Sequence, residues 1–160
     1  MSERHLAHLV EANRMFADQI RTADQKAAYI FTFILALVVW SAETRRSFSL
    51  EHIATTGILN AAAGLVLMGA VGVSLVSALC VVLPRSRPGT SILFWGAWPG
   101  AATALDEARR QGDTEFLYED YMQNTKTLAA ICQAKYRMVA IAFRAMFVVF
   151  ASYIALLMTG

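Results

Sequence analysis

The sequence predicts an all-α membrane protein, in which three transmembrane helices and two cytoplasmic amphipathic helices, one N-terminal and one central, pack as a bundle. Composition is the first observation: 57% of the 160 residues are hydrophobic and 16% are charged, against about 45–50% and about 25% in soluble domains. The second observation is the presence of three long apolar runs, and the third is that two polar segments have helical spacing. The length suits a single domain, 1–160, and lipid must cover part of its apolar surface.

The N-terminal segment, residues 1–26, is predicted to be a cytoplasmic helix. Its apolar residues recur every three or four positions, which is typical of one helix face. This stripe also contains two polar residues, and it consists of Leu6, Leu9, Asn13, Phe16, Ile20, Asp24 and Ala27.

The first span is predicted at residues 27–42, which contain no charge. A helix of this length covers about 24 Å, slightly less than a hydrocarbon core of about 30 Å. Tyr29 and Trp40 near its ends are typical interfacial anchors. We assign residues 43–57 to an outer loop.

The second span is predicted at residues 58–83, an uncharged run long enough to cross the bilayer with some tilt. Small or polar residues recur in this span and just before it at intervals of four, a spacing that lets helices approach closely. The two series are Thr56, Asn60 and Gly64, and Ala70, Ser74 and Ala78.

The connection 84–112 begins with helix-breaking residues, including Pro84 and Pro88. Its aromatic residues, Phe94, Trp95 and Trp98, indicate a segment that rests on the bilayer interface or against the spans.

Arg85 and Arg87 in this connection have two interpretations. Arginines at a membrane boundary commonly determine topology. Together with the backbone of Gly89–Thr90–Ser91 they also have the chemistry to hold a phosphate, because turn N–H groups and guanidinium suit oxyanions.

The central cytoplasmic helix is predicted at residues 113–138. Gly112 ends the preceding segment and Asp113 suits the N-cap, with Glu115, Glu119 and Asp120 near the positive end of the helix dipole. Its stripe consists of Leu117, Tyr121, Asn124, Leu128, Ile131, Lys135 and Met138.

The third span is predicted at residues 139–158, interrupted by Arg144. A charge at mid-bilayer costs roughly 2.5–3.5 kcal/mol on insertion scales. Arg144 therefore either snorkels towards the cytoplasmic surface or lines a polar path between helices.

The distribution of basic residues predicts the topology. Eleven Lys and Arg residues fall in the N-terminal segment and in 84–138, whereas the 43–57 loop has two. By the positive-inside rule, the N-terminus is cytoplasmic and the C-terminus lies outside.

The two stripes match in register. Asn13 precedes Ala27 by fourteen residues, and Asn124 precedes Met138 by fourteen. Asp24 and Lys135 each lie three residues before those same reference positions, so we expect them at one height within packing distance. Such buried polar residues either fix the register of a helix bundle or line a polar ligand pocket above the membrane.

No feature indicates an enzyme, a metal site or a nucleic-acid polymer as partner. Nucleophile, GxGxxG, GxxxxGK and HExxH motifs are absent. His5, His8 and Glu11 share a face that we interpret as solvated, and Cys80 and Cys132 as reduced packing residues. The net charge of +2 is too small to indicate a nucleic-acid partner.

Three short motifs then indicate a family. They are Ala23-Asp24-x-Lys26-Ala27, Leu93-Phe94-x-Gly96 after Pro84-Arg85, and Tyr121…Asn124…Leu128-Ala129…Lys135-Tyr136. In their order and position they resemble the transmembrane effectors of Pycsar, a bacterial anti-phage system. The resemblance implies that a partner cyclase makes cyclic UMP or cyclic CMP on infection. The effector would bind this ligand and disrupt the inner membrane, so that the infected cell dies or arrests.

A cyclic-nucleotide site needs a cation for the phosphate, polar partners for the base edge and an aromatic or apolar wall. Our candidates from the stripes and the connection are Asn13, Arg21, Asp24, Lys26, Arg85, Arg87, Tyr121, Asn124 and Lys135. The preferred interpretation is a ligand-gated homo-oligomer that impairs the bilayer. Alternatives are an accessory or scaffold membrane subunit that docks a partner protein through its cytoplasmic helices and, with less support, a membrane enzyme.

Overall fold

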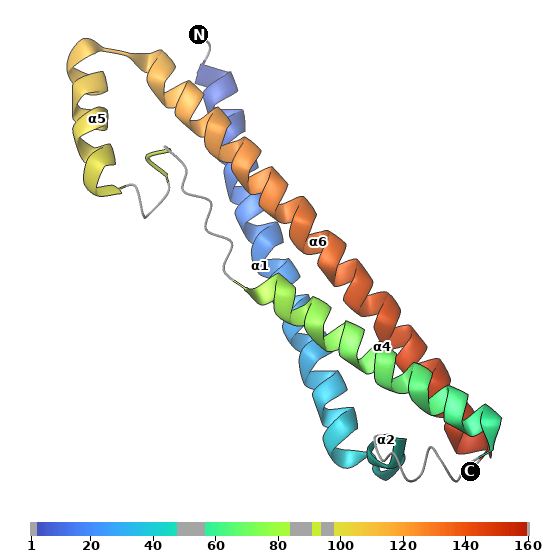
Figure 1. Cartoon of the computed structure of the whole chain (residues 1–160). Helices are drawn as coiled ribbons and strands as arrows, with labels where there is room; N and C mark the ends of the chain where they lie inside the picture. The colour runs from blue at the N-terminus through green and yellow to red at the C-terminus, as the bar shows by residue number, and fades with distance from the viewer. Residues whose placement is uncertain (1–2, 48–56, 84–90, 94–97, 160) are drawn as a thin grey trace. The chain divides into compact units, whose positions relative to one another are not determined.

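A computed structural model of the chain describes residues 3–47, 57–83, 91–93 and 98–159 (Figure 1). The described residues form helices and no strands, which confirms the predicted all-α class. The helices are α1 (Glu3–Trp40), α2 (Ala42–Ser47), α4 (Ile58–Val82), α5 (Trp98–Gln111) and α6 (Thr114–Thr159).

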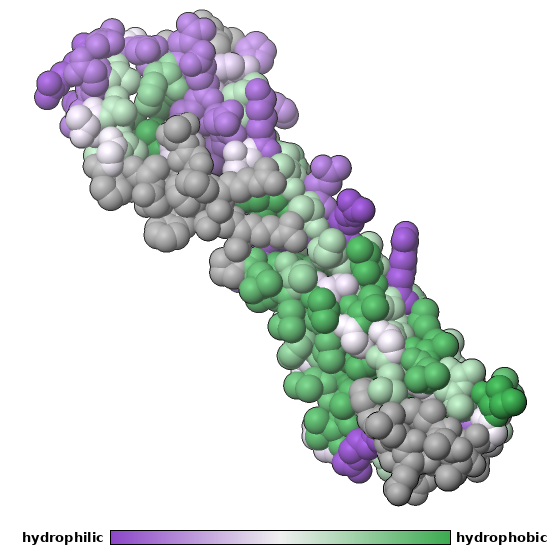
Figure 2. Space-filling view, viewed as in Figure 1, coloured by the Kyte–Doolittle hydropathy of each residue, from purple (hydrophilic) through white to green (hydrophobic). Residues whose placement is uncertain are grey.

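Three of these helices are long and apolar enough to cross a membrane. Their qualifying stretches are Arg4–Trp40, Ile58–Val82 and Glu115–Met158. Hydrophobic residues dominate the visible surface of α4 and of the part of α6 beside it (Figure 2), and large apolar side chains such as Leu65, Val73 and Val76 are exposed there. Such a surface requires a lipid environment, so the chain is a membrane protein. The borders proposed above between membrane and water remain predictions.

The chain divides into two compact units. The first comprises Met1–Thr22 with Pro84–Ala134, and the second comprises Ala23–Leu83 with Lys135–Gly160. Because α1 and α6 are continuous helices, each contributes residues to both units. The sequence had indicated a single domain, and each unit is described by itself below.

The second unit is a three-helix bundle of α1, α4 and α6. Its core contains Ala23, Ala27, Ile30 and Ile34 of α1 together with Leu67, Val71, Val81, Val139, Ala142 and Val149. Small residues let these helices approach closely, and α4 turns Ala70, Ser74 and Ala78 to the interior, as their spacing predicted. The Ser74 hydroxyl donates a 3.1 Å hydrogen bond to the carbonyl oxygen of Ala142 on α6. Thr56 of the other predicted series lies outside the described residues.

The first unit contains the junction between α5 and α6. Gly112 has φ +66°, a left-handed conformation that favours glycine. The N–H of Gly112 donates to the carbonyl of Arg109 (3.3 Å), and that of Asp113 donates to the carbonyl of Ala108 (2.9 Å). These two bonds form a Schellman motif.

The same turn starts α6. The Asp113 carboxylate accepts hydrogen bonds from the N–H groups of Glu115 (3.0 Å) and Phe116 (3.1 Å), so Asp113 is the N-cap of α6. The predicted helix boundary at Gly112 and Asp113 is confirmed. Helix α5 lies within the connection 84–112 and was not predicted as a helix; that this segment rests on the bilayer interface or against the spans stays a prediction. Pro99 of α5 stands in the first turn, where the missing N–H costs little.

Candidate functional site

Asn13 is the centre of a polar cluster in the first unit. Its side chain is buried, and its amide nitrogen lies 2.9 Å from the Leu9 carbonyl, 3.3 Å from the Tyr121 carbonyl and 2.6 Å from the Thr125 hydroxyl. Its amide oxygen accepts a hydrogen bond from the side chain of Asn124. The cluster therefore joins α1 to α6 in this unit through side chains that satisfy each other.

Thr125 completes this polar cluster, and sequence reasoning missed it. Its hydroxyl accepts from Asn13 and donates to the Tyr121 carbonyl at 2.6 Å. A threonine on a helix commonly bonds the carbonyl four residues earlier, and no spacing in the sequence indicates that the Thr125 oxygen also faces α1. The cluster brings together Asn13, Asn124 and Tyr121 of the sequence-based candidates.

The cluster is partly open. Asn124 and Tyr121 are half-buried, and the Asn124 amide oxygen and second N–H are not used by any hydrogen bond to the described residues. An amide with a free donor and acceptor has the chemistry to pair with a base edge. The fully engaged Asn13 has the chemistry of a residue that fixes helix register.

A second polar contact in this unit holds the chain that precedes α5. The Asp120 carboxylate of α6 accepts from the Ser91 hydroxyl (3.1 Å) and from the Ile92 N–H (2.9 Å). Ser91 is buried. A carboxylate in contact with Ser91 would repel a phosphate at that hydroxyl. Arg85, Arg87 and the remainder of the proposed phosphate-binding turn, Gly89 and Thr90, lie outside the described residues.

Lys135 is the centre of a polar contact in the second unit, and it joins all three helices of the bundle. Its amino group forms an ion pair with the Asp24 carboxylate of α1 and donates a 2.7 Å hydrogen bond to the Val81 carbonyl of α4. The Lys135 side chain is 7% exposed, whereas that of Asp24 is 37% exposed. The expected contact between these two residues is confirmed.

The hydrogen bond from Lys135 to the Val81 carbonyl was not predicted from the sequence. This carbonyl belongs to the last turn of α4, whose final carbonyls have no partner within the helix, and a lysine near a helix C-terminus suits such acceptors. Two of the three donors of the Lys135 ammonium are thus used by protein groups, and its charge is balanced by Asp24.

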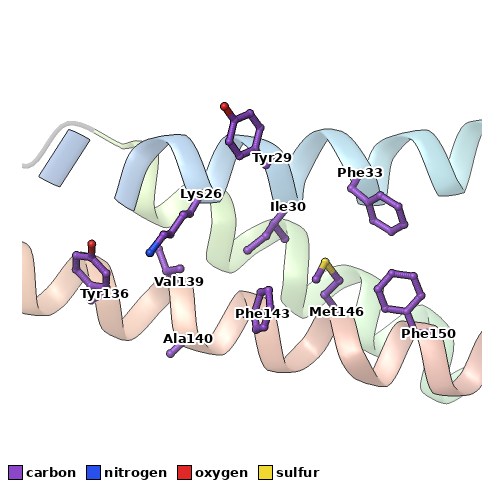
Figure 3. Close-up of a pocket in the computed structure, with 10 residues that line it drawn as sticks. All are labelled: Lys26, Tyr29, Ile30, Phe33, Tyr136, Val139, Ala140, Phe143, Met146 and Phe150. Atoms are coloured by element: carbon purple, nitrogen blue, oxygen red, sulfur yellow. The ribbon is translucent and has the colours of Figure 1, made fainter. Parts of the chain in front are cut away.

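Lys26 lines an apolar groove of about 600 Å³ between α1 and α6 in the second unit (Figure 3). Its amino group lies 5.4 Å from the ring centroid of Tyr136, a cation–π distance. The other lining residues are Tyr29, Ile30, Phe33, Val139, Ala140, Phe143, Met146 and Phe150. Arg21, the remaining candidate, belongs to the first unit and is exposed.

The described residues contain no group of three or more metal-ligating side chains. His5, His8 and Glu11 are all exposed on α1, and Cys80 and Cys132 are free thiols. These residues therefore give no geometric support for a metal or disulfide site within the described part of the chain.

Comparison with models of protein families gives a match that covers nearly the whole chain. The model of a family described as the Pycsar effector protein domain matches residues 8–160. No curated protein and no solved structure matches the chain.

Proposed function

The chain belongs to the Pycsar effector family, whose model covers residues 8–160, and on this premise we propose that it senses cyclic UMP or cyclic CMP and then impairs the bacterial inner membrane. Family membership makes the chain an anti-phage membrane effector and connects it to a cyclic-nucleotide signal from a cyclase. The proposal adds the ligand, its site, the membrane that is damaged and a cytoplasmic N-terminus.

The observation that carries the proposal is the polar cluster of Asn13, Asn124 and Thr125. Each pyrimidine base presents donors and acceptors on one edge. The free donor and acceptor of the Asn124 amide match such an edge. Half-buried Tyr121, three residues earlier on α6, carries an aromatic ring of the kind that suits the wall of a base site.

The phosphate of the ligand carries one negative charge and requires a cation. Arg21, exposed on α1, and Arg85 and Arg87 in the connection are the proposed cations. We leave Lys135 and Asp24 out of the nucleotide site, because each satisfies the other within the second unit.

Signal transmission follows from the continuity of the two helices that hold the cluster. Both α1 and α6 continue into the second unit, which contains the apolar helices. A ligand that prefers one packing of α1 against α6 shifts the equilibrium only by its differential affinity, about 5.5 kcal/mol for a near-complete switch. We propose that the shifted form acts as a homo-oligomer that permeabilises the bilayer.

The test is thermal unfolding of the full chain in detergent with cyclic UMP, cyclic CMP, cyclic AMP and cyclic GMP. A ligand at one hundred times its dissociation constant adds about 2.7 kcal/mol to the free energy of unfolding. We expect this gain with one or both pyrimidine nucleotides. Asn124→Ala should weaken binding about tenfold or more, because one base-edge interaction is lost.

Gln123→Ala is the matched control, since Gln123 is the exposed neighbour of Asn124 on α6. It should bind like the unchanged chain. Dye release from liposomes then tests the output, and the pyrimidine nucleotide should trigger release from liposomes with the unchanged chain and with Gln123→Ala. Stabilisation by no cyclic nucleotide would contradict the sensing proposal and favour a scaffold role, and binding without release would contradict the membrane step.

A further inference from the structure

The groove between α1 and α6 of the second unit has an extended apolar floor. From Tyr136 to Phe150 it follows fourteen residue steps of α6, about 21 Å of helix, which exceeds half of a hydrocarbon core of about 30 Å. Phe33 and Phe150 lie at one end, and Ile30, Phe143 and Met146 lie between the ends (Figure 3). This length and composition suit a hydrocarbon chain that lies along the helices.

The opposite end of the groove is polar and cationic. Figure 3 shows Tyr136 and Lys26 towards this end, with Tyr29 farther along α1 next to Ile30. Lys26 is exposed, and Tyr29 is 72% exposed. Aromatic rings with a polar tip and a lysine with an apolar stem are typical of the level of lipid headgroups.

Arg144 adds a second positive charge beside this groove. It follows Ala140 of the groove by one helical turn and is exposed, and it has no hydrogen bond or ion pair to any residue that the structure describes. The Cα–Cβ bond of a helical residue tilts towards the N-terminus of its helix, so a long side chain at position 144 has the reach to extend towards the Lys26 end of the groove.

The chain itself offers no anion to balance these cations within the spans. Residues 27–42, 58–83 and 139–158 contain no aspartate or glutamate, and nearby Asp24 is already paired with Lys135. A second copy of the chain has the apolar surface to cover the groove but brings no carboxylate to it from its spans. A phospholipid supplies both groups that the groove suits: its phosphate carries the negative charge, and its acyl chain is the hydrocarbon.

We propose that this groove binds an anionic phospholipid. One acyl chain lies along Phe143 towards Phe150, and the headgroup phosphate lies at the Lys26 end, where Arg144 also contacts it. Basic pockets between transmembrane helices are a known way to hold such headgroups. The site is separate from the polar cluster around Asn13, and its occupation does not require a cyclic nucleotide.

The test compares spin-labelled phosphatidylglycerol with spin-labelled phosphatidylcholine in vesicles that contain the full chain. Electron paramagnetic resonance measures the fraction of each lipid that is immobilised by protein. We expect phosphatidylglycerol to be preferred. Lys26→Gln and Arg144→Gln should each lower that preference by about fivefold, as each cation contributes roughly 1 kcal/mol near the bilayer surface. Arg14→Gln, which removes an exposed cation from the first unit, should leave the preference unchanged.

A groove-filling variant gives an independent reading of the acyl-chain position. Ala140→Trp places a large ring in the groove from an exposed position, and it should reduce the immobilised fraction of both lipids while Lys26→Gln reduces only the charge preference. Equal association of both lipids with the unchanged chain would overturn the proposal. So would a preference that survives Lys26→Gln and Arg144→Gln together, or cross-linking that places a second copy in the groove.

Discussion

The amino group of Lys135 donates a 2.7 Å hydrogen bond to the main-chain carbonyl of Val81, in the last turn of α4. The same amino group is paired with Asp24 of α1. One side chain of α6 thus neutralises a charge on one helix and satisfies an unpaired carbonyl on another. This arrangement makes the three helices of the second unit interdependent at that level.

Removal of Asp24 should therefore harm the protein more than removal of Lys135. Asp24→Ala leaves a buried ammonium without its counter-charge, which costs about 3–5 kcal/mol. Lys135→Met leaves a carboxylate that is 37% exposed and remains hydrated, and we expect a loss of about 1–3 kcal/mol. Unfolding by sodium dodecyl sulfate in mixed micelles measures both.

The double replacement provides the control for this pair. It should be less damaging than Asp24→Ala alone, because no buried charge remains unpaired. Additive effects in the cycle would contradict a direct interaction between the two residues.

Gly112→Ala should destabilise the first unit by about 1–2 kcal/mol, because an alanine at φ +66° is strained. Gly100→Ala in α5 is the matched control. An added Cβ meets nothing within 4 Å at either glycine, so the two differ in backbone conformation and not in space. Gly100→Ala should be neutral or stabilising by about 0.5–1 kcal/mol, and equal effects in thermal unfolding would refute this account.

Ser74→Leu should disrupt the contact between α4 and α6. Ser74 is fully buried against Ala142, and a larger side chain there costs about 1–3 kcal/mol through overpacking. Ser74→Ala removes only the hydrogen bond and should cost less than about 1 kcal/mol. Val73→Leu, at a position that is 49% exposed, should have almost no effect on the same unfolding assay.

The topology proposal predicts which cysteines an impermeant reagent reaches in intact cells. In a background with Cys80 and Cys132 replaced by serine, Gly57→Cys should react from outside, whereas Arg14→Cys and Gln123→Cys should react only after lysis. All three positions are exposed in the structure. Reaction of position 14 or 123 in intact cells would reverse the orientation given by the basic residues.

Much of the fold followed from the sequence, because its signals are local. Uncharged runs predicted the apolar helices, and Gly112 with Asp113 predicted the boundary of α6 through backbone conformation and capping. The contact of Asp24 with Lys135 followed from counting residues along two helices.

The unpredicted parts depend on tertiary placement or on ambiguous local signals. Val81 accepts the Lys135 hydrogen bond through its main-chain carbonyl, so its side chain gives no signal in the sequence. The contact depends on where α4 ends beside α6. The groove results from side-chain sizes on two separate helices, with small Ala140 among large rings. Helix α5 was not predicted because the connection was interpreted from its helix-breaking prolines and its aromatic residues, although a proline such as Pro99 is tolerated in a first turn.

The three-helix contact at Lys135 also determines when the second unit can be completed during synthesis. The ribosome completes α1 and α4 before it reaches Lys135. Until then Asp24 has no counter-ion from α6, and the end of α4 lacks its capping amine. The nascent second unit is therefore incomplete until the last helix emerges, and a chain truncated before Lys135 should be recognised by proteases as unassembled.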